Sequence, residues 1–180
     1  MLKRIFKRLH RGLTTLPGPG DWLELGVAAV LFALAALLLA GPELLSVPDS
    51  IEWGAVFALA ARVLLVPSLL EEAVFRGALN PHPRERTGRR DVLLWGLLSV
   101  TAYTAMHPLN GVLLLALSGG ASQAGAIFLD PAFIALVALL GLACLILYRR
   151  SGSLWTPTLL HALVVTVWLS LGGSGVLPAP

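Results

Sequence analysis

Two adjacent glutamates, Glu71 and Glu72, lie in a strongly apolar stretch and are followed by Arg76. Charged side chains are costly inside a membrane span, so they mark functional candidates. On a helix, Glu72 and Arg76 are i,i+4 neighbours that can pair, whereas Glu71 points about 100° away from that pair. Glu71 is therefore the freer carboxylate and a candidate to take a proton from water. The alternative is an interfacial salt bridge that only anchors the helix.

Two histidines lie in other apolar stretches of the chain. His107 follows Tyr103 by four residues, which places both side chains on one helix face. His161 lies at a depth comparable to that of Glu71 when counted at about 1.5 Å per residue. A single histidine in a membrane helix is more often a packing group, but two histidines together with a carboxylate pair favour a joint site. The predicted site residues are Glu71, His107 and His161, supported by Glu72, Arg76 and Tyr103.

The same residues raise the question of a metal. One glutamate and two histidines from three helices can form a catalytic zinc site. The chain has no H-E-x-x-H motif, which would indicate zinc specifically, so zinc is compatible with the sequence but not required by it. No G-x-S-x-G motif or serine–histidine pair stands out either. Covalent serine catalysis is therefore disfavoured, and direct attack by water is favoured.

The composition indicates the class of protein that must position these groups. Of 180 residues, 57% are apolar and 13% are charged, against roughly 25% charged in soluble domains. We predict an all-α membrane protein, a polytopic bundle of about five transmembrane helices. An N-terminal amphipathic helix and a short re-entrant or interfacial segment complete the predicted fold. The predicted spans are residues 22–40, 53–80, 92–107, 126–148 and 154–171, with the re-entrant or interfacial piece at 111–125.

The distribution of basic residues indicates the topology. Residues 1–21 form a basic segment with amphipathic spacing that suits an anionic membrane surface, although a solvated positive tail is an alternative. Further basic residues lie at 84–90 and 149–150, whereas residues 41–52 contain no Lys or Arg. The positive-inside rule then predicts a cytoplasmic N-terminus. We expect an integral multi-pass protein of the plasma (inner) membrane, with residues 22–180 as a single transmembrane domain and a core at about 53–171.

Two further sequence features limit what the chain can do. The single cysteine, Cys144, cannot form an internal disulfide or a thiolate cluster. The basic residues flank spans without aromatic interleaving, so no nucleic-acid partner is expected. Arg62 lies near the middle of the second predicted span, and we expect it to pair inside the bundle.

Three motifs follow one another along the chain: E-E-x-x-x-R at 71–76, aromatic-x-x-x-His at 103–107, and S-G-S-L-W-x-P-x-x-x-H at 151–161. Their combination resembles the CPBP intramembrane proteases, which include the CAAX prenyl endopeptidases and the bacterial Abi or bacteriocin-processing proteins. The resemblance covers roughly residues 53–171. Two positions depart from the family pattern. Tyr103 replaces the usual Phe, and Val165 replaces the Asn or Asp that usually follows the last histidine by four residues.

The resemblance implies a helix bundle around a cavity open to the cytosol. In it Glu71 activates water to cleave a peptide bond, and His107 and His161 position the water or stabilise the oxyanion. Glu72 and Arg76 then hold the helix and tune Glu71. The implied partners are the lipid bilayer and a membrane-bound peptide or protein substrate, and no cofactor is required. Thr158 or Trp168, on the same helix face as His161, can take the place of the partner missing at position 165.

The leading hypothesis is therefore a glutamate-dependent intramembrane endopeptidase. The alternative, motivated by Val165, is a catalytically inactive membrane scaffold or immunity-type protein of the same fold. A proton-coupled carrier would use the same buried groups as a relay, but about five short spans without internal repeats disfavour it.

Overall fold

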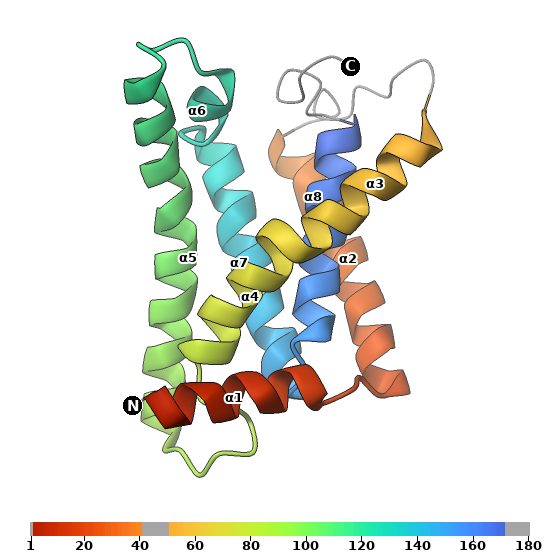
Figure 1. Cartoon of the computed structure of the whole chain (residues 1–180), viewed down its shortest axis with the longest axis vertical. Coiled ribbons are helices and arrows are strands. Elements are labelled where there is room, and N and C mark those ends of the chain that lie inside the picture. Colours follow the sequence, from red (N-terminus) through yellow and green to blue (C-terminus); the bar gives the residue numbers. More distant parts are fainter. Residues whose placement is uncertain (1, 41–50, 172–180) are drawn as a thin grey trace.

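The structure is a computed structural model that describes residues 2–40 and 51–171; these residues form helices joined by turns and loops, without a β-strand. Figure 1 shows how the helices are arranged. They are α1 (Leu2–Thr14), α2 (Pro19–Ala40), α3 (Trp53–Val63), η2 (Leu64–Leu69), α4 (Leu70–Glu72), η3 (Ala73–Ala78), α5 (Arg89–Leu117), α6 (Gln123–Ile127), α7 (Pro131–Ser151) and α8 (Trp155–Leu171).

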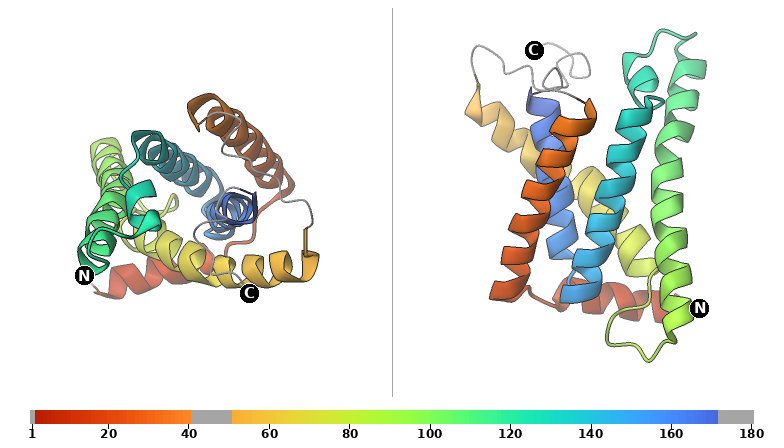
Figure 2. Two further views of the ribbon diagram at one scale, coloured as in Figure 1. Left: turned by 90° about the horizontal axis from the view of Figure 1, so that it is seen from above. Right: turned by 180° about the vertical axis from the view of Figure 1, so that it is seen from behind.

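The long helices form a membrane bundle. Among the described residues, four stretches are long and apolar enough to cross a bilayer: Pro19–Leu39, Trp53–Ala78, Arg89–Leu117 and Pro131–Ser151. α8 is a shorter apolar helix of 17 residues, about the minimum for a span. It packs against α2, α3 and α7, and Figure 2 shows it among these helices. The predicted all-α membrane bundle is confirmed.

The third span is longer than predicted. α5 continues through Pro108 to Leu117, so the returning segment begins only after this residue. The chain turns at Gly119 and Gly120, both at positive φ, and α6 packs back on α5. A Cβ on Gly111 would lie 2.9 Å from the carbonyl oxygen of Gly125. Glycine at positions 111 and 125 therefore lets α6 pack closely on the continuous helix α5.

The helix that carries the glutamates is broken on both sides of them. The π-helical segments η2 and η3 flank the three residues of α4, which include Glu71 and Glu72. Pro67 lies within η2, and Val66 has a non-helical conformation, because the proline ring sterically disfavours a helical backbone in the residue before it. Departures from α-helical winding of this kind are frequent at functional sites.

The N-terminal helix lies across one end of the bundle, where α7 ends and α8 begins (Figure 1). One face of α1 buries Gly12 and contacts η3. Its other side exposes apolar side chains, with Leu2 71% and Phe6 69% exposed. An amphipathic helix with such a face can lie in the plane of the membrane surface. The position of α1 therefore fits the amphipathic segment predicted from the sequence.

Arg62 differs from the prediction. Its side chain is exposed on α3, and it has no carboxylate within 4.0 Å among the described residues. The expected pair inside the bundle is therefore wrong. The sequence placed Arg62 at membrane depth, but the direction in which it points depends on how α3 packs.

Candidate active site

Glu72 lies at the centre of a buried polar cluster. Its side chain is 0% exposed, and Oε2 lies 3.1 Å from Arg76 Nε. On its other side, Nδ1–H of His161 donates to Glu72 Oε1 at 3.1 Å. The i,i+4 ion pair expected from the sequence is present. The hydrogen bond to His161, a residue 89 positions away, follows from the packing of α8 against the helix of the glutamates.

Arg76 is held by two other helices as well. Its side chain is fully buried, and Nη2 donates to the carbonyl oxygen of Gly141 at 2.6 Å. The guanidinium carbon lies 4.7 Å from the centre of the Tyr103 ring, which is a favourable cation–π distance. A Cβ on Gly141 would lie 2.9 Å from Tyr103 Cδ1. Glycine at this position of α7 therefore lets the tyrosine and the arginine approach the helix backbone.

Glu71 is separate from this ion pair. Its side chain is 18% exposed, and Oε2 lies 3.9 Å from His161 Nε2, too far for a hydrogen bond. Glu71 Oε2 is buried and has no hydrogen-bond partner among the described residues. The two neighbouring glutamates thus differ as their helical positions predicted: Glu72 is engaged by protein groups, whereas Glu71 keeps an oxygen available.

The two histidines have the same hydrogen-bonding arrangement. His161 Nδ1 faces a carboxylate, and His107 Nδ1 lies 3.0 Å from the carbonyl oxygen of Tyr103. Both partners can only accept a hydrogen bond, so each Nδ1 carries a proton. In the neutral rings Nε2 then carries the lone pair. Each histidine therefore has one nitrogen fixed by the protein and one that can bind a small molecule.

The Tyr103 ring connects the histidines. Its centre lies 5.1 Å from that of His107 and 5.9 Å from that of His161, both in edge-to-face contacts. Tyr103 is 1% exposed. The structure thus gathers Glu71, Glu72, Arg76, Tyr103 and His161 into one cluster. His107 joins that cluster through the tyrosine ring, and no hydrogen bond or ion pair links it to either glutamate among the described residues.

The partner of His161 differs from those considered in the sequence. Thr158 Oγ1 is buried without a hydrogen-bond partner, and Trp168 packs on Phe133 instead. Neither bonds to His161. Glu72 supplies the partner from a different helix, a contact that no pattern within residues 151–165 could have indicated.

The backbone next to the site is fixed by two side chains. Ser99 Oγ and Asn80 Nδ2 each donate to the carbonyl oxygen of Phe75 at 2.7 Å. Phe75 lies in η3, the residue before Arg76. Because π-helical winding disturbs the regular i→i−4 bonding, these two donors stabilise the segment that carries Arg76.

The residues do not form a recognisable metal centre. Within residues 2–40 and 51–171, no group of three His, Cys, Asp or Glu side chains converges as a metal site requires. Glu71 and His161 approach each other, but a third protein ligand does not join them. The described residues therefore offer no support for the three-ligand zinc site that the sequence left open.

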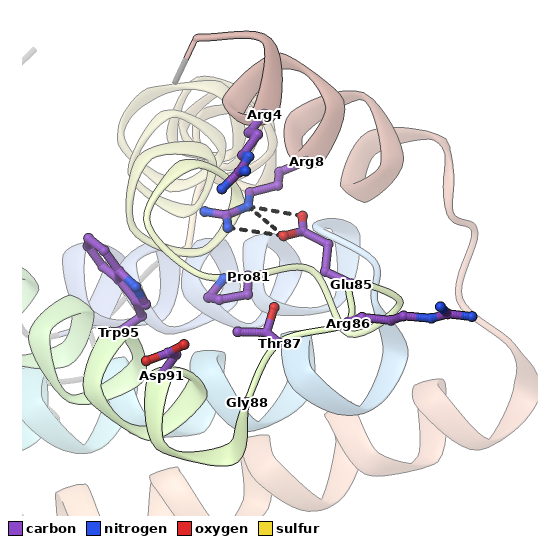
Figure 3. Close-up of a pocket in the computed structure, with 9 residues that line it drawn as sticks. All are labelled: Arg4, Arg8, Pro81, Glu85, Arg86, Thr87, Gly88, Asp91 and Trp95. Carbon is purple, nitrogen blue, oxygen red and sulfur yellow. Dashed lines mark hydrogen bonds and ion pairs between the residues drawn. The ribbon is translucent and has the colours of Figure 1, made fainter.

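A separate polar pocket lies at the end of the bundle near α1. Its volume is about 440 Å³, and none of the six predicted site residues lines it. Figure 3 shows Arg8 paired with Glu85 at its edge. Burial raises the pKa of Glu85, but the hydrogen bonds and charge of Arg8 outweigh this effect, and the pKa is lowered overall. The pocket is distinct from the carboxylate–histidine cluster.

Comparison with known protein families gives a match that covers most of the chain. The family model described as "Type II CAAX prenyl endopeptidase Rce1-like" matches residues 52–167, which include all three motifs and the whole cluster. Comparisons with curated proteins and with solved structures gave no match.

Proposed function

Because the chain belongs to the type II CAAX prenyl endopeptidase Rce1-like family, we propose that it hydrolyses a peptide bond of a membrane-associated substrate, with Glu71 activating the attacking water. The observation that carries this proposal is the contrast between the two glutamates. Glu72 Oε2 lies 3.1 Å from Arg76 Nε, and Glu72 Oε1 accepts a hydrogen bond from His161. Glu71 Oε2, which is also buried, has only the longer contact of 3.9 Å with His161 Nε2 among the described residues.

The reaction uses Glu71 as general base and then as general acid. A water molecule bound by Glu71 gives it a proton and attacks the carbonyl carbon of the substrate. The carbonyl oxygen becomes an oxyanion in the tetrahedral intermediate. Glu71 returns the proton to the leaving nitrogen as the carbon–nitrogen bond breaks, which yields a carboxylic acid and an amine. A positioned acid–base group contributes roughly 10²–10⁴-fold to such a rate.

His161 is proposed to act next to Glu71. Its Nδ1 is held by Glu72, which fixes the ring and leaves Nε2 on the side of Glu71. In the neutral form Nε2 accepts a hydrogen bond from the water and orients it. In the protonated form it donates to the oxyanion. A donor placed in a site of low dielectric contributes several kcal/mol to stabilising developing negative charge.

His107 is proposed as the second group that positions water or stabilises the oxyanion. Its Nδ1 is fixed by the Tyr103 carbonyl, so Nε2 is the nitrogen available to substrate or water. Glu72 and Arg76 hold the site helix, and Tyr103 supports both histidine rings. Zinc has no step in this proposal, because no three-ligand set of His, Cys, Asp or Glu converges within residues 2–40 and 51–171.

The proposed location follows the charge distribution. The protein is an integral membrane protein, and we propose the plasma (inner) membrane with the N-terminus in the cytoplasm. The basic end of α7 and the basic helix α1 then lie on the same side, in agreement with the positive-inside rule. The substrate would be a membrane-bound peptide or protein that reaches Glu71 from within this bundle.

The test compares new protein N-termini in membranes that contain the wild type, Glu71→Gln or Glu52→Gln at equal levels. Glu52 is the matched control, since it lies exposed before the same broken helix and caps no backbone group. Products should appear with the wild type and the control but not with Glu71→Gln. A chelator should leave them unchanged.

Two outcomes would contradict the proposal. Identical N-termini in all membranes, in a host that supplies native substrates, would favour the inactive scaffold suggested by Val165. Loss of the products with chelator would show that the mechanism needs a metal. The hydrogen bond from His161 to Glu72 weakens the argument for a scaffold. Because Glu72 orients the histidine ring, a polar side chain at position 165 is not needed for that purpose.

A further inference from the structure

α1 connects the two segments that carry the proposed catalytic groups. It lies outside the matched residues 52–167, yet it packs on η3, the segment that directly follows Glu72. Its last turn bonds to the beginning of α8, the helix of His161. A single helix, α1, therefore contacts both the segment that follows the glutamates and the helix that carries His161.

Arg8 forms the contact with the end of the glutamate helix. Its Nη1 donates to the carbonyl oxygen of Ala78, the last residue of η3, at 3.2 Å. Its Nε and Nη2 donate to Glu85 at 3.0 Å (Figure 3). A cation at the carbonyl end of a helix is electrostatically favourable. Arg8 thus ties α1 both to η3 and to the loop that follows it.

A glycine lets α1 approach the site helix closely. Leu9 Cδ2 lies 2.6 Å from the place where a Cβ on Gly77 would be. Gly77 directly follows Arg76, whose guanidinium pairs with Glu72. The leucine of α1 therefore packs on the backbone only one residue away from the buried ion pair.

The last turn of α1 is bonded to α8. The Leu154 backbone N–H donates to the carbonyl oxygen of Gly12 at 2.9 Å, and Trp155 Nε1–H donates to that of Leu13 at 2.9 Å. The last carbonyls of a helix have no partner within it, so α8 satisfies them. Leu154 is fully buried, and its side chain occupies the space that a Cβ on Gly12 or on Gly77 would approach. It lies between α1 and η3.

We propose that α1 is a brace that sets the position of the glutamates relative to His161, and that Arg8 is a positioning residue for the reaction. This inference rests on the proposed function. The hydrogen bond between Glu72 and His161 joins the two segments at the site. Glu71 and His161 have no hydrogen bond to each other, so the distance between them also depends on how the two segments are held beyond that bond. A shift of about 1 Å in such a geometry can cost on the order of 100-fold in rate.

The first experiment measures docking without using activity. Hydrogen exchange of peptides that contain the Leu154 amide reports the bond to Gly12. Arg8→Gln should accelerate this exchange at least severalfold. Lys7→Gln is the matched control, because Lys7 is an exposed neighbour on α1 and the substitution removes the same charge. It should leave exchange at Leu154 unchanged.

The second experiment measures catalysis with the full chain in detergent or vesicles. Arg8→Gln should lower kcat about tenfold or more with little change in KM, because Arg8 lies outside the carboxylate–histidine cluster and acts on it through η3. Arg8→Lys should retain part of the activity, since it keeps the charge but not the forked contact with Glu85. Lys7→Gln should change kcat less than twofold. Gly12→Ala, which brings a Cβ to 2.8 Å from Leu154 Cγ, should act like Arg8→Gln.

The outcomes separate the brace from the proposed function. Faster exchange at Leu154 with unchanged kcat in both Arg8→Gln and Gly12→Ala would overturn the brace, and so would unchanged exchange in both variants. An equal loss of kcat in Lys7→Gln would also overturn it, because surface charge would then be the cause. If wild-type cleavage does not depend on Glu71, the proposed function fails, while the exchange experiment still decides whether Arg8 holds α1 to α8.

Discussion

Replacing Glu72 by glutamine is expected to destabilise the protein far more than the same replacement of Glu71. The two residues are adjacent and the substitution is nearly isosteric, so only their surroundings differ. Glu72 is 0% exposed, as is its partner Arg76. Glutamine can still accept the hydrogen bond from His161, but it leaves the guanidinium as a buried charge without a counterion.

The magnitude follows from that uncompensated charge. Removing one partner of a buried ion pair costs about 3–5 kcal/mol. For a chain of this size, each kcal/mol lowers the midpoint of thermal unfolding by about 2–4 °C, so Glu72→Gln should melt about 6–20 °C below the wild type. Glu71 Oε2 has no hydrogen-bond partner among the described residues, and Glu71→Gln should cost about 1 kcal/mol or less.

Thermal unfolding in one detergent, with the wild type, both glutamine variants and Glu52→Gln side by side, tests this expectation. Activity is measured on the same samples at a temperature where all are folded. Glu71→Gln should be folded and inactive. Equal melting temperatures for Glu71→Gln and Glu72→Gln would refute the reasoning, since the pairing of Glu72 would then contribute nothing beyond that of its neighbour.

Two further predictions concern Gly141, which packs on Tyr103, and His82, which lies outside the cluster in the loop between η3 and α5. Gly141→Val should lower the free energy of unfolding by about 1–3 kcal/mol through overpacking against Tyr103. The control in thermal unfolding is Gly26→Val, because Gly26 has open space around it. Equal stability of the two variants would contradict the packing argument. Burial lowers the pKa of His82 from 6.5, so folding favours the neutral ring. Its contribution to stability is present above pH 6.5 and is lost as the pH falls below that value. His82→Gln should therefore flatten the dependence of the melting temperature on pH between about 7 and 5, whereas an unchanged slope would show that other groups cause it.

Local patterns in the sequence predicted much of the fold. Apolar stretches of span length define α2, α5 and α7, because a helix in lipid must satisfy its own backbone groups and shield them with apolar side chains. The end of the third span was less predictable. Pro108 and the polar Asn110 indicate an end at His107, yet the helix continues to Leu117, since packing of α6 on Gly111 supports the added turns.

The sequence also determined which of the two glutamates pairs with Arg76. A spacing of four residues pairs Glu72 with Arg76 on any helix and turns Glu71 away, whatever surrounds them. The contact between Glu72 and His161 is different, because it joins residues 89 positions apart and depends on the packing of α8 against α3 and η2. The exposure of the Arg62 side chain likewise depends on how α3 packs in the bundle.

What only the tertiary structure decided is how close the helices come. Gly141, Gly77 and Gly12 carry no chemistry that a motif would reveal, yet each removes a Cβ that would meet a neighbouring helix or side chain within 3 Å. The sequence by itself determined which groups can react, because residue types and local spacing are intrinsic to the chain. Their distances in space required the packing of helices that are far apart in sequence, and that packing is set by the sum of many small contacts.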